Sequence, residues 1–211
     1  METYMETLGC RAKEASRAAA KLTTVEKNRG LEFVAEELCL RKEELLSENE
    51  KDMEAAREQG MSEALQDRLR LTQARIEAMA EGLRQIAGLS DPIGEVLSMK
   101  NRPNGLRIGK KRVPLGVVGI IYESRPNVTA DAFGLCFKTG NAVILRGGSD
   151  AINSNKAIVQ VIKAGLRKAR LSQDLILLVE DTSRAVATEM MRLHEYLSLI
   201  HISEPTRLQL I

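Results

Sequence analysis

The sequence predicts an α/β fold, in which a helical N-terminal region precedes part of a doubly wound parallel sheet. Residues from about Ala12 to Gly88 are rich in Ala, Leu, Glu, Lys and Arg, the residues that form helices most readily. From Pro114 onward, short apolar runs alternate with helix-like segments, an order typical of a parallel sheet with right-handed crossovers. The expected division is a helical region over 1–92, a β-hairpin or linker over 93–113, an incomplete α/β domain over 114–196 and a tail over 197–211.

The helical region contains a start signal and a break. Thr23 and Glu26 have the spacing of a capping box, in which a hydroxyl and a carboxylate satisfy free backbone N–H groups. Gly60 and Ser62 interrupt the apolar stripes that follow at helical spacing. We therefore expect two or three helices held by ordinary apolar packing, because no heptad pattern is sustained. The stripe residues are Leu31, Val34, Leu38, Leu45, Leu65, Leu69, Ile76, Met79 and Leu83.

A turn signal separates the helices from the alternating segment. Pro103, Asn104 and Gly105 lie between two short mixed runs, a pattern typical of two extended pieces joined by a turn. An exposed β-hairpin is expected there. Its basic side chains are interpreted as solvated, with contact to a second subunit or to phosphate as the alternative. They are Lys100, Arg102, Arg107, Lys110, Lys111 and Arg112.

The alternating segment predicts three strands, each followed by a helix. Apolar runs at 116–121, 142–145 and 175–179 predict strands buried on both faces. The expected helices cover about 128–138 and 153–168, with a last one capped by Asp181-Thr182-Ser183 and ending near His194. Ligands of such sheets bind at the carboxyl ends of the strands. The expected site therefore comprises the loops 122–127, 146–150 and 180–183.

Among these loops, Arg146-Gly147-Gly148-Ser149 has the clearest chemistry. Two glycines let backbone N–H groups approach an anion, Arg146 supplies a forked cation, and the next helix directs its N-terminus there. These residues alone leave two interpretations open. One is a phosphate-binding turn, and the other is a strand-to-helix turn that uses Gly and Ser for geometry and capping.

The loop after the first strand, Glu123 to Asn127, is a second polar cluster. Its simplest interpretation is a tight turn in which Asn127 caps the next helix. The alternative is that Arg125 binds a carboxylate or a phosphate.

Composition excludes several classes of protein. No run approaches the ~18 apolar residues of a membrane-spanning helix, and acids near the N-terminus argue against a targeting peptide, so a cytoplasmic protein without a membrane partner is expected. A net charge of +2 and the absence of Trp give no reason to expect a nucleic-acid partner. Cys10, Cys39 and Cys136 are widely spaced, which predicts reduced thiols and no metal site.

Two longer stretches resemble a known family. Residues 114–129 (PLGVVGIIYESRPNVT) and 138–149 (KTGNAVILRGGS) closely resemble gamma-glutamyl phosphate reductase, or glutamate-5-semialdehyde dehydrogenase, of the aldehyde dehydrogenase superfamily. The resemblance extends from about Ala12 to Tyr196. It implies a Rossmann-like sheet of the aldehyde dehydrogenase type. It also implies NADPH-dependent reduction of L-glutamyl 5-phosphate to L-glutamate 5-semialdehyde with release of phosphate, a step of proline biosynthesis.

The resemblance implies a cofactor site after the second strand. Arg146 takes the position at which many aldehyde dehydrogenases place a lysine beside the adenosine ribose, and Gly147, Gly148 and Ser149 follow it. These four residues are therefore the expected cofactor-binding residues. A guanidinium at this position suits the 2′-phosphate of NADP, so the resemblance implies NADP(H) as the cofactor.

The resemblance implies a substrate site after the first strand. Ser124, Arg125 and Asn127 occupy the place of the superfamily loop that carries an oxyanion-stabilising asparagine. The expected small-molecule substrate is L-glutamyl 5-phosphate. The family also implies a homo-oligomer at full length and a functional link to glutamate 5-kinase.

The family's chemistry uses a cysteine thiolate that attacks the acyl phosphate. No cysteine of this chain matches that nucleophile, so it is expected beyond residue 211, and the chain alone is expected to be inactive. Residues 197–211 resemble the translation of a transposase sequencing adapter and are expected to add nothing to the fold. The alternative function is a non-catalytic nucleotide-binding or subunit-interaction module.

Overall fold

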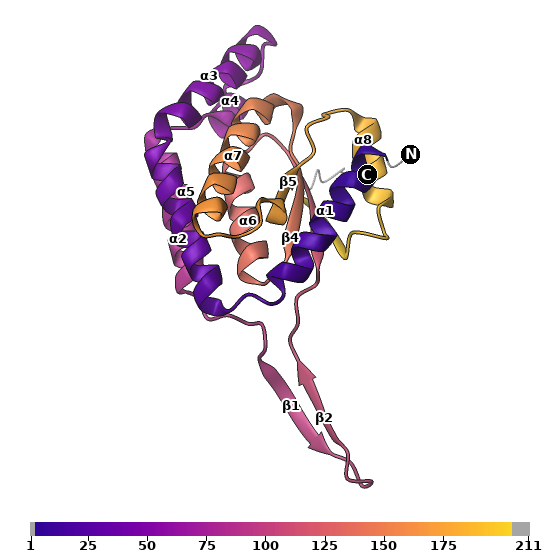
Figure 1. Cartoon of the computed structure of the whole chain (residues 1–211). Coiled ribbons are helices and arrows are strands. Elements are labelled where there is room, and N and C mark those ends of the chain that lie inside the picture. The colour runs from indigo at the N-terminus through magenta and orange to yellow at the C-terminus, as the bar shows by residue number, and fades with distance from the viewer. Residues whose placement is uncertain (1–2, 204–211) are drawn as a thin grey trace.

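The computed structural model describes residues 3–203, and a parallel sheet lies at its centre (Figure 1). The strands β3 (Val117–Tyr122), β4 (Ala142–Arg146), β5 (Ile176–Leu178) and β6 (Leu199–Ser203) are parallel in the order β5-β4-β3-β6. The apolar runs predicted as the first three strands are therefore confirmed. β4 and β5 are buried along almost their whole length, as expected for central strands covered on both faces.

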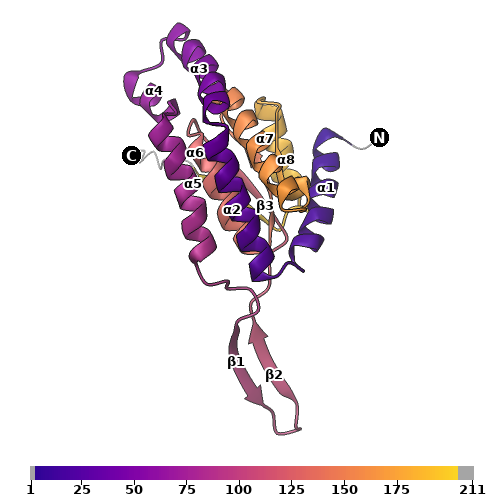
Figure 2. The same ribbon diagram turned by 60° about the vertical axis from the view of Figure 1, so that its left-hand side comes forward.

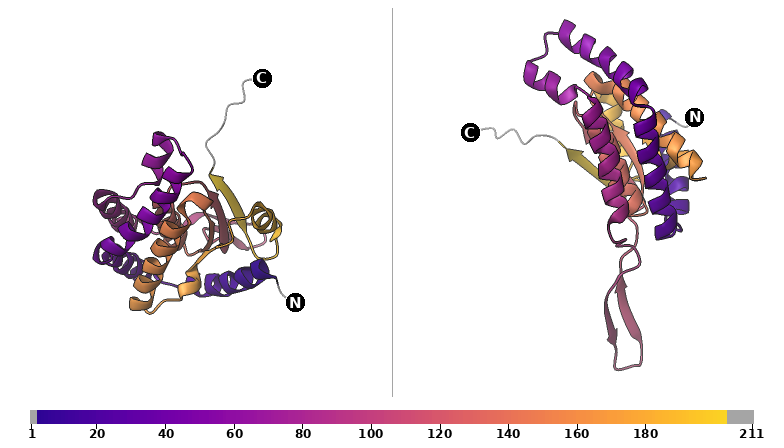
Figure 3. Two further views of the ribbon diagram at one scale, coloured as in Figure 1. Left: turned by 90° about the horizontal axis from the view of Figure 1, so that it is seen from above. Right: turned by 90° about the vertical axis from the view of Figure 1, so that its left-hand side faces the viewer.

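Helices cover both faces of this sheet. α6 (Asn127–Lys138) and α7 (Ile152–Lys168) pack on one face, whereas α1 (Tyr4–Ala19) and α8 (Arg184–Arg192) lie on the other (Figure 3). The chain moves outward from β3 through β4 to β5 and then crosses back to β6. Because parallel crossovers are right-handed, this reversal puts α8 on the opposite face from α6 and α7. The predicted doubly wound arrangement is confirmed.

The return strand β6 lies in the segment that was expected to add nothing to the fold. Leu197 is buried, and Leu199 to Ser203 pair in parallel with Val118 to Tyr122. Apolar side chains at 197, 199, 200 and 202 supply the β-rich pattern that an edge strand needs. The exclusion of this segment from the fold is therefore wrong for residues 197–203. Residues 204–211 lie outside the described part of the chain.

An outer layer of helices packs on α6 and α7. It consists of α2 (Thr24–Leu40) and α5 (Gln73–Gly88), and α3 (Lys42–Glu58) and α4 (Glu63–Leu69) extend it at one end (Figure 2). The capping box of Thr23 and Glu26 is confirmed at the start of α2, and the break near Gly60 separates α3 from α4. The described N-terminal region has five helices rather than two or three. The additional breaks fall at Arg41, whose backbone is not helical, and at residues 70–72.

The hairpin predicted around Pro103-Asn104-Gly105 is confirmed and projects away from the body (Figure 1). Its antiparallel strands are β1 (Val96–Asn101) and β2 (Arg107–Lys111), and every residue in them is exposed. Gly105 has a φ of +84°, a conformation that glycine adopts without strain. The Asn104 side chain accepts a hydrogen bond from Leu106 N, as expected for a turn residue. Within the described residues, no helix is long and apolar enough to cross a membrane.

A buried ion pair anchors the base of this hairpin. The carboxylate of Asp91, just before the hairpin, pairs with Lys27 of α2 and accepts hydrogen bonds from Thr24 Oγ1 (2.9 Å) and Ile93 N (3.0 Å). Lys27 is only 2% exposed, so Asp91 supplies the counter-charge of a cation that water scarcely reaches. Burial acts to raise the pKa of Asp91, but Lys27 and the two hydrogen bonds outweigh it and hold the pKa below its ordinary value of 3.8.

The lowered pKa of Asp91 predicts a specific acid sensitivity. A carboxylate with a depressed pKa in the folded state stabilises the protein above its unfolded pKa, and that contribution is lost as the pH falls through the folded pKa. The stability difference between the wild type and Asp91→Asn should therefore narrow between about pH 5 and pH 3 in urea unfolding. The exposed Glu95, which pairs with Arg112, provides the control variant Glu95→Gln. A difference that stayed constant with pH in Asp91→Asn would contradict this assignment.

Candidate functional site

Three loops meet at the carboxyl edge of the sheet, as predicted. The Ser124 hydroxyl after β3 donates a hydrogen bond to Asp150 Oδ2 after β4, at 2.8 Å. Arg146 at the end of β4 donates through Nη2 to the carbonyl oxygen of Thr182 after β5, at 2.6 Å. Each contact joins two loops that are far apart in sequence. The carboxyl ends of β3, β4 and β5 thus form one connected polar edge.

Arg146 is half-buried within this edge and is only partly hydrogen-bonded. Its Nε–H is buried and has no hydrogen-bond partner among the described residues. A buried donor without a partner is costly, and an anionic ligand would satisfy it. The nearby Asp181 has a lowered pKa, mainly because Ser183 donates hydrogen bonds to it and to a smaller extent because of the Arg146 charge. The environment of Arg146 fits an anion such as a phosphate.

The two glycines after Arg146 are packed against the protein itself. A Cβ on Gly147 would lie 2.3 Å from Asn155 Nδ2 and 3.2 Å from the Tyr122 hydroxyl, so a side chain does not fit there. Gly148 has a φ of −61° and faces Ser124. Ser149 is exposed and begins the short turn Ser149–Ala151 that leads into α7. Internal packing therefore gives a sufficient reason for Gly147, and the anion-binding role of this turn stays a prediction.

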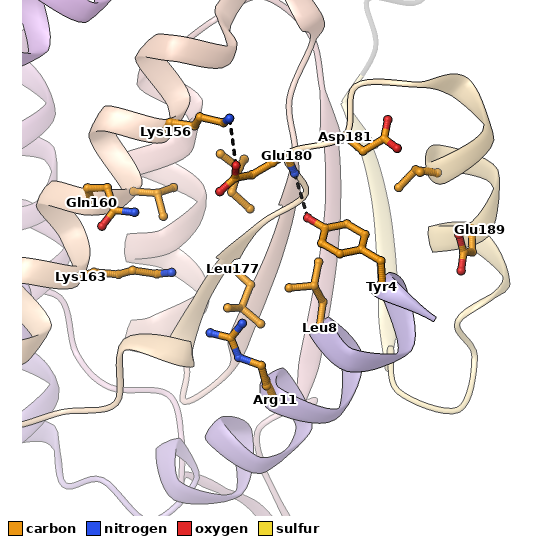
Figure 4. Close-up of a pocket in the computed structure, with 13 residues that line it drawn as sticks. Tyr4, Leu8, Arg11, Lys156, Gln160, Lys163, Leu177, Glu180, Asp181 and Glu189 are labelled. Carbon is orange, nitrogen blue, oxygen red and sulfur yellow. Dashed lines mark hydrogen bonds and ion pairs between the residues drawn. The ribbon is translucent and has the colours of Figure 1, made fainter. Parts of the chain in front are cut away.

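A cavity of about 640 Å³ lies between α1, α7 and α8, beside the end of β5 (Figure 4). We call it the α7–α8 cavity. Lys156 Nζ and Glu180 Oε2 pair across its wall at 2.9 Å, and Glu180 N donates to the Tyr4 hydroxyl at 3.1 Å. Lys163 also lines it, and burial lowers the pKa of this lysine. Asp181 lines the cavity and precedes Thr182, whose carbonyl oxygen accepts the hydrogen bond from Arg146. Arg146 is not itself one of the lining residues.

A second cavity of about 400 Å³ lies between the start of α5 and the turn from β3 into α6. We call it the α5–α6 cavity. Arg125, Asn127 and Asp131 line it from the α6 side. From the α4–α5 side it is lined by Asp67, Arg68, Arg70, Leu71, Arg75, Ala78 and Met79. Four guanidinium groups and two carboxylates thus border one space.

The loop residues predicted to bind substrate are divided between two surroundings. Arg125 and Asn127 line the α5–α6 cavity, whereas Ser124 is bonded to Asp150 in the neighbouring loop. The interpretation of Asn127 as a helix cap is wrong, because Pro126 is the N-cap of α6 and Asn127 is the first helical residue. Its amide instead donates to Asp131 Oδ2 one turn later, at 3.2 Å.

Sequence reasoning missed most of the residues that line these cavities. Arg68, Arg70 and Asp131 lie on separate helices or helix ends, and only the fold brings them to the loop that carries Asn127. Lys156 and Lys163 lie on one face of α7, where an amphipathic pattern predicts only solvation. For Arg68 and Arg70 the sequence did carry a signal, because residues 67–72 belong to the stretch that resembles the reductase family.

None of the three cysteines lines either cavity. Cys10 is exposed on α1, and Cys39 is half-buried on α2. Cys136 is buried in α6, and burial raises the pKa of its thiol to about 11, so it stays protonated near neutral pH. Cys39 lies beside a guanidinium, since Arg84 Nη2 is 3.8 Å from its Sγ, but it lines neither cavity. No group of metal-binding side chains occurs among residues 3–203.

Comparison with known proteins links this architecture to one family. No protein-family model matches the chain. Gamma-glutamyl phosphate reductase of Clostridium botulinum (strain Alaska E43 / Type E3) is 56% identical over 192 residues, which are 91% of this chain and 46% of the relative. The enzyme of the same name from Lachnospira eligens is 56% identical over 196 residues, which are 93% of this chain and 47% of the relative. The chain therefore spans about half the length of the curated relatives it matches.

The solved structures agree with these relatives. The crystal structure of gamma-glutamyl phosphate reductase from Thermotoga maritima has a TM-score of 0.94 and 43% identity, over 97% of this chain and 49% of that one. A probable aldehyde dehydrogenase from Listeria monocytogenes, at 16% identity and a TM-score of 0.71 over 93% of this chain and 40% of that one, shares the fold. Over nearly its whole described length, the chain is similar in both sequence and fold to the N-terminal part of gamma-glutamyl phosphate reductases.

Proposed function

We propose that this chain belongs to a protein that reduces L-glutamyl 5-phosphate to L-glutamate 5-semialdehyde with NADPH and releases phosphate. The observation that carries the proposal is the similarity to gamma-glutamyl phosphate reductases over more than nine tenths of the chain. The aldehyde dehydrogenase fold and the polar carboxyl edge of the sheet are consistent with it. A cytoplasmic homo-oligomer with a functional link to glutamate 5-kinase is part of the same proposal and rests on the resemblance alone.

The proposed division of labour follows the fold. Residues 114–196 supply the cofactor side of the site, and the helices of residues 1–92 cover it. The hairpin over 93–113 extends from the body. The nucleophilic cysteine is proposed to come from a segment outside this chain, because none of the described cysteines lines either cavity.

The cofactor is proposed to bind where β4 and β5 end. When bound, NADPH supplies the hydride for the reduction. Arg146 would hold an anionic group of the cofactor through the guanidinium N–H that has no protein partner. The adjoining α7–α8 cavity, with Lys156 and Lys163 on its wall, has room for the adenosine end. Asn127, at the α5–α6 cavity, would present its amide to the acyl oxygen of the substrate.

The whole activity can be tested in a protein that contains this chain and reaches the length of its curated relatives. NADPH oxidation should depend on L-glutamyl 5-phosphate, and phosphate should be released in equal amount. Nucleotide binding without such turnover would instead favour the non-catalytic module.

The role of Arg146 predicts a selective loss of cofactor affinity. In fluorescence titrations, Arg146→Gln should weaken NADPH binding about tenfold, the effect expected when one charge-assisted contact is lost. NADH has no 2′-phosphate, so its affinity should change much less. Arg102→Gln, on the exposed hairpin, is the matched control. Equal losses for the two cofactors would contradict a 2′-phosphate contact.

A further inference from the structure

The side chains of the α5–α6 cavity carry an uneven distribution of charge. Arg75 is already engaged, because its Nη2 lies 3.1 Å from both carboxylate oxygens of Asp67 and its Nη1 donates to the Arg70 carbonyl at 2.7 Å. These contacts neutralise one cation and one anion within the cavity wall. Arg68, Arg70, Arg125 and Asp131 remain, with a combined charge of +2. A ligand with more negative than positive groups would balance that charge.

The three remaining arginines have no ion pair or side-chain hydrogen bond within residues 3–203. All three are exposed toward solvent. Their planar guanidinium groups suit carboxylate and phosphate oxygens, which they can bind in a bidentate manner. Arg68 and Arg70 flank the end of α4, opposite the α6 side of the cavity. An anionic ligand can therefore be held from one side while its other end reaches Asn127.

Asp131 is the carboxylate on the opposite wall. It is half-buried in the second turn of α6, and Asn127 Nδ2 is its hydrogen-bond donor. Burial raises the pKa of Asp131, and the bond from Asn127 offsets only part of this effect. No cation of the described chain pairs with it, although arginines line the same cavity. Asp131 itself lines the α5–α6 cavity, so a ligand in that cavity can reach its carboxylate.

We propose that the α5–α6 cavity recognises the amino-acid head of the substrate, with Asp131 binding the α-ammonium group and Arg68 and Arg70 binding the α-carboxylate. This inference rests on the proposed reduction of L-glutamyl 5-phosphate and names the residues that select it. The side chains of Asn127 and Asp131 adjoin, with Asn127 Nδ2 3.2 Å from Asp131 Oδ2. Only two methylene groups separate the acyl carbon of a glutamyl chain from Cα, so a chain whose α-ammonium binds Asp131 has its acyl end close to Asn127. Asn127 then faces the acyl end while Asp131 receives the ammonium.

The test uses stable probes that each lack one group of the head. L-glutamate carries both groups, glutarate lacks the ammonium, and γ-aminobutyrate lacks the α-carboxylate. In titration calorimetry with the full 211-residue chain, L-glutamate should bind in the millimolar range and the other two about tenfold more weakly. Asp131→Asn should lower L-glutamate affinity about tenfold and abolish the preference for L-glutamate over glutarate. Arg70→Gln should abolish the preference for L-glutamate over γ-aminobutyrate. The control Arg102→Gln should leave both ligand preferences unchanged.

Several outcomes would overturn the inference. They are the absence of saturable L-glutamate binding, wild-type affinity in Asp131→Asn, or a preference over glutarate that persists in that variant. Asp131→Asn preserves size and shape, and circular dichroism will confirm that it folds. Failure of the proposed function is distinguishable from failure of this inference. Reductase activity with an unchanged KM for L-glutamyl 5-phosphate in Asp131→Asn would reject the head site alone, whereas intact head selectivity without reductase activity would reject the reaction alone.

Discussion

Replacing Asp52 with alanine is expected to destabilise the protein by about 3–5 kcal/mol, because it leaves several buried donors without a partner. Asp52 lies on α3 and is 2% exposed. Its Oδ1 accepts hydrogen bonds from Asn153 N (3.2 Å) and Asn153 Nδ2 (2.9 Å). Its Oδ2 accepts from Ser154 N (2.8 Å) and Ser154 Oγ (2.5 Å). One carboxylate from another helix thus caps the N-terminus of α7.

The effect should extend beyond the cap. Free N–H groups at a helix start attract negative charge, and α7 has no capping side chain of its own. The neighbouring Asn49 donates to Ser154 Oγ at 3.0 Å and to the Leu69 carbonyl at 2.9 Å, and it accepts from Leu71 N at 2.7 Å. Loss of Asp52 therefore also loosens the contact that holds α3 to the end of α4.

Urea unfolding followed by circular dichroism measures this loss. Glu54→Ala, on the exposed face of the same helix, is the matched control and should stay within about 0.5 kcal/mol of the wild type. Asp52→Asn retains an acceptor oxygen, so its stability should lie between those of Asp52→Ala and Glu54→Ala. If Asp52→Ala and Glu54→Ala had equal midpoints and slopes, the buried network would contribute nothing measurable to stability.

The fold was largely predictable because its signals are local. The capping box at Thr23, the turn at Pro103-Asn104-Gly105 and the apolar strand runs each act over a few residues, and each appears in the structure. The breaks at Arg41 and at residues 70–72 carry no Gly or Pro. The second one does have a local signal that was missed, because Thr72 caps α5 and its hydroxyl accepts a hydrogen bond from Arg75 N. β6 was excluded because its sequence resembles an adapter. Its pairing with β3 depends on a run rich in apolar, β-forming side chains, and that property is independent of where the residues came from.

The site was predictable only along the strand ends. The rule that ligands of parallel sheets bind at the carboxyl edge located the three loops and their contacts. The same rule does not apply to helices that pack beside the loops. For that reason sequence reasoning missed Arg68, Arg70 and Asp131 as residues that line a cavity. Gly147 was assigned to anion binding from sequence alone. The unsatisfied Asn155 amide that fills the space beside it becomes visible only in three dimensions.

Gly165→Ala is expected to destabilise the protein by about 2 kcal/mol or more, although alanine is the better helix former. A Cβ at this position in α7 would lie 2.6 Å from Val34 Cα and 2.8 Å from Val34 N in α2. These are backbone atoms, so no change of rotamer relieves the overlap. The gain in helix propensity is only about 1 kcal/mol, and moving α2 away from α7 costs more because both helices bury apolar faces there.

In the matched control, the same substitution is expected to raise the stability of the protein instead of lowering it. Gly82 lies in the interior of α5, and the nearest atom to a Cβ there is 3.9 Å away, so Gly82→Ala should stabilise the protein by about 0.5–1 kcal/mol. Thermal unfolding of both variants therefore separates two effects of the same substitution. If Gly165→Ala were also stabilising, α2 would be free to shift on α7. The outer layer of α2 and α5, of which α5 lines the α5–α6 cavity, would then be held less rigidly than its burial implies.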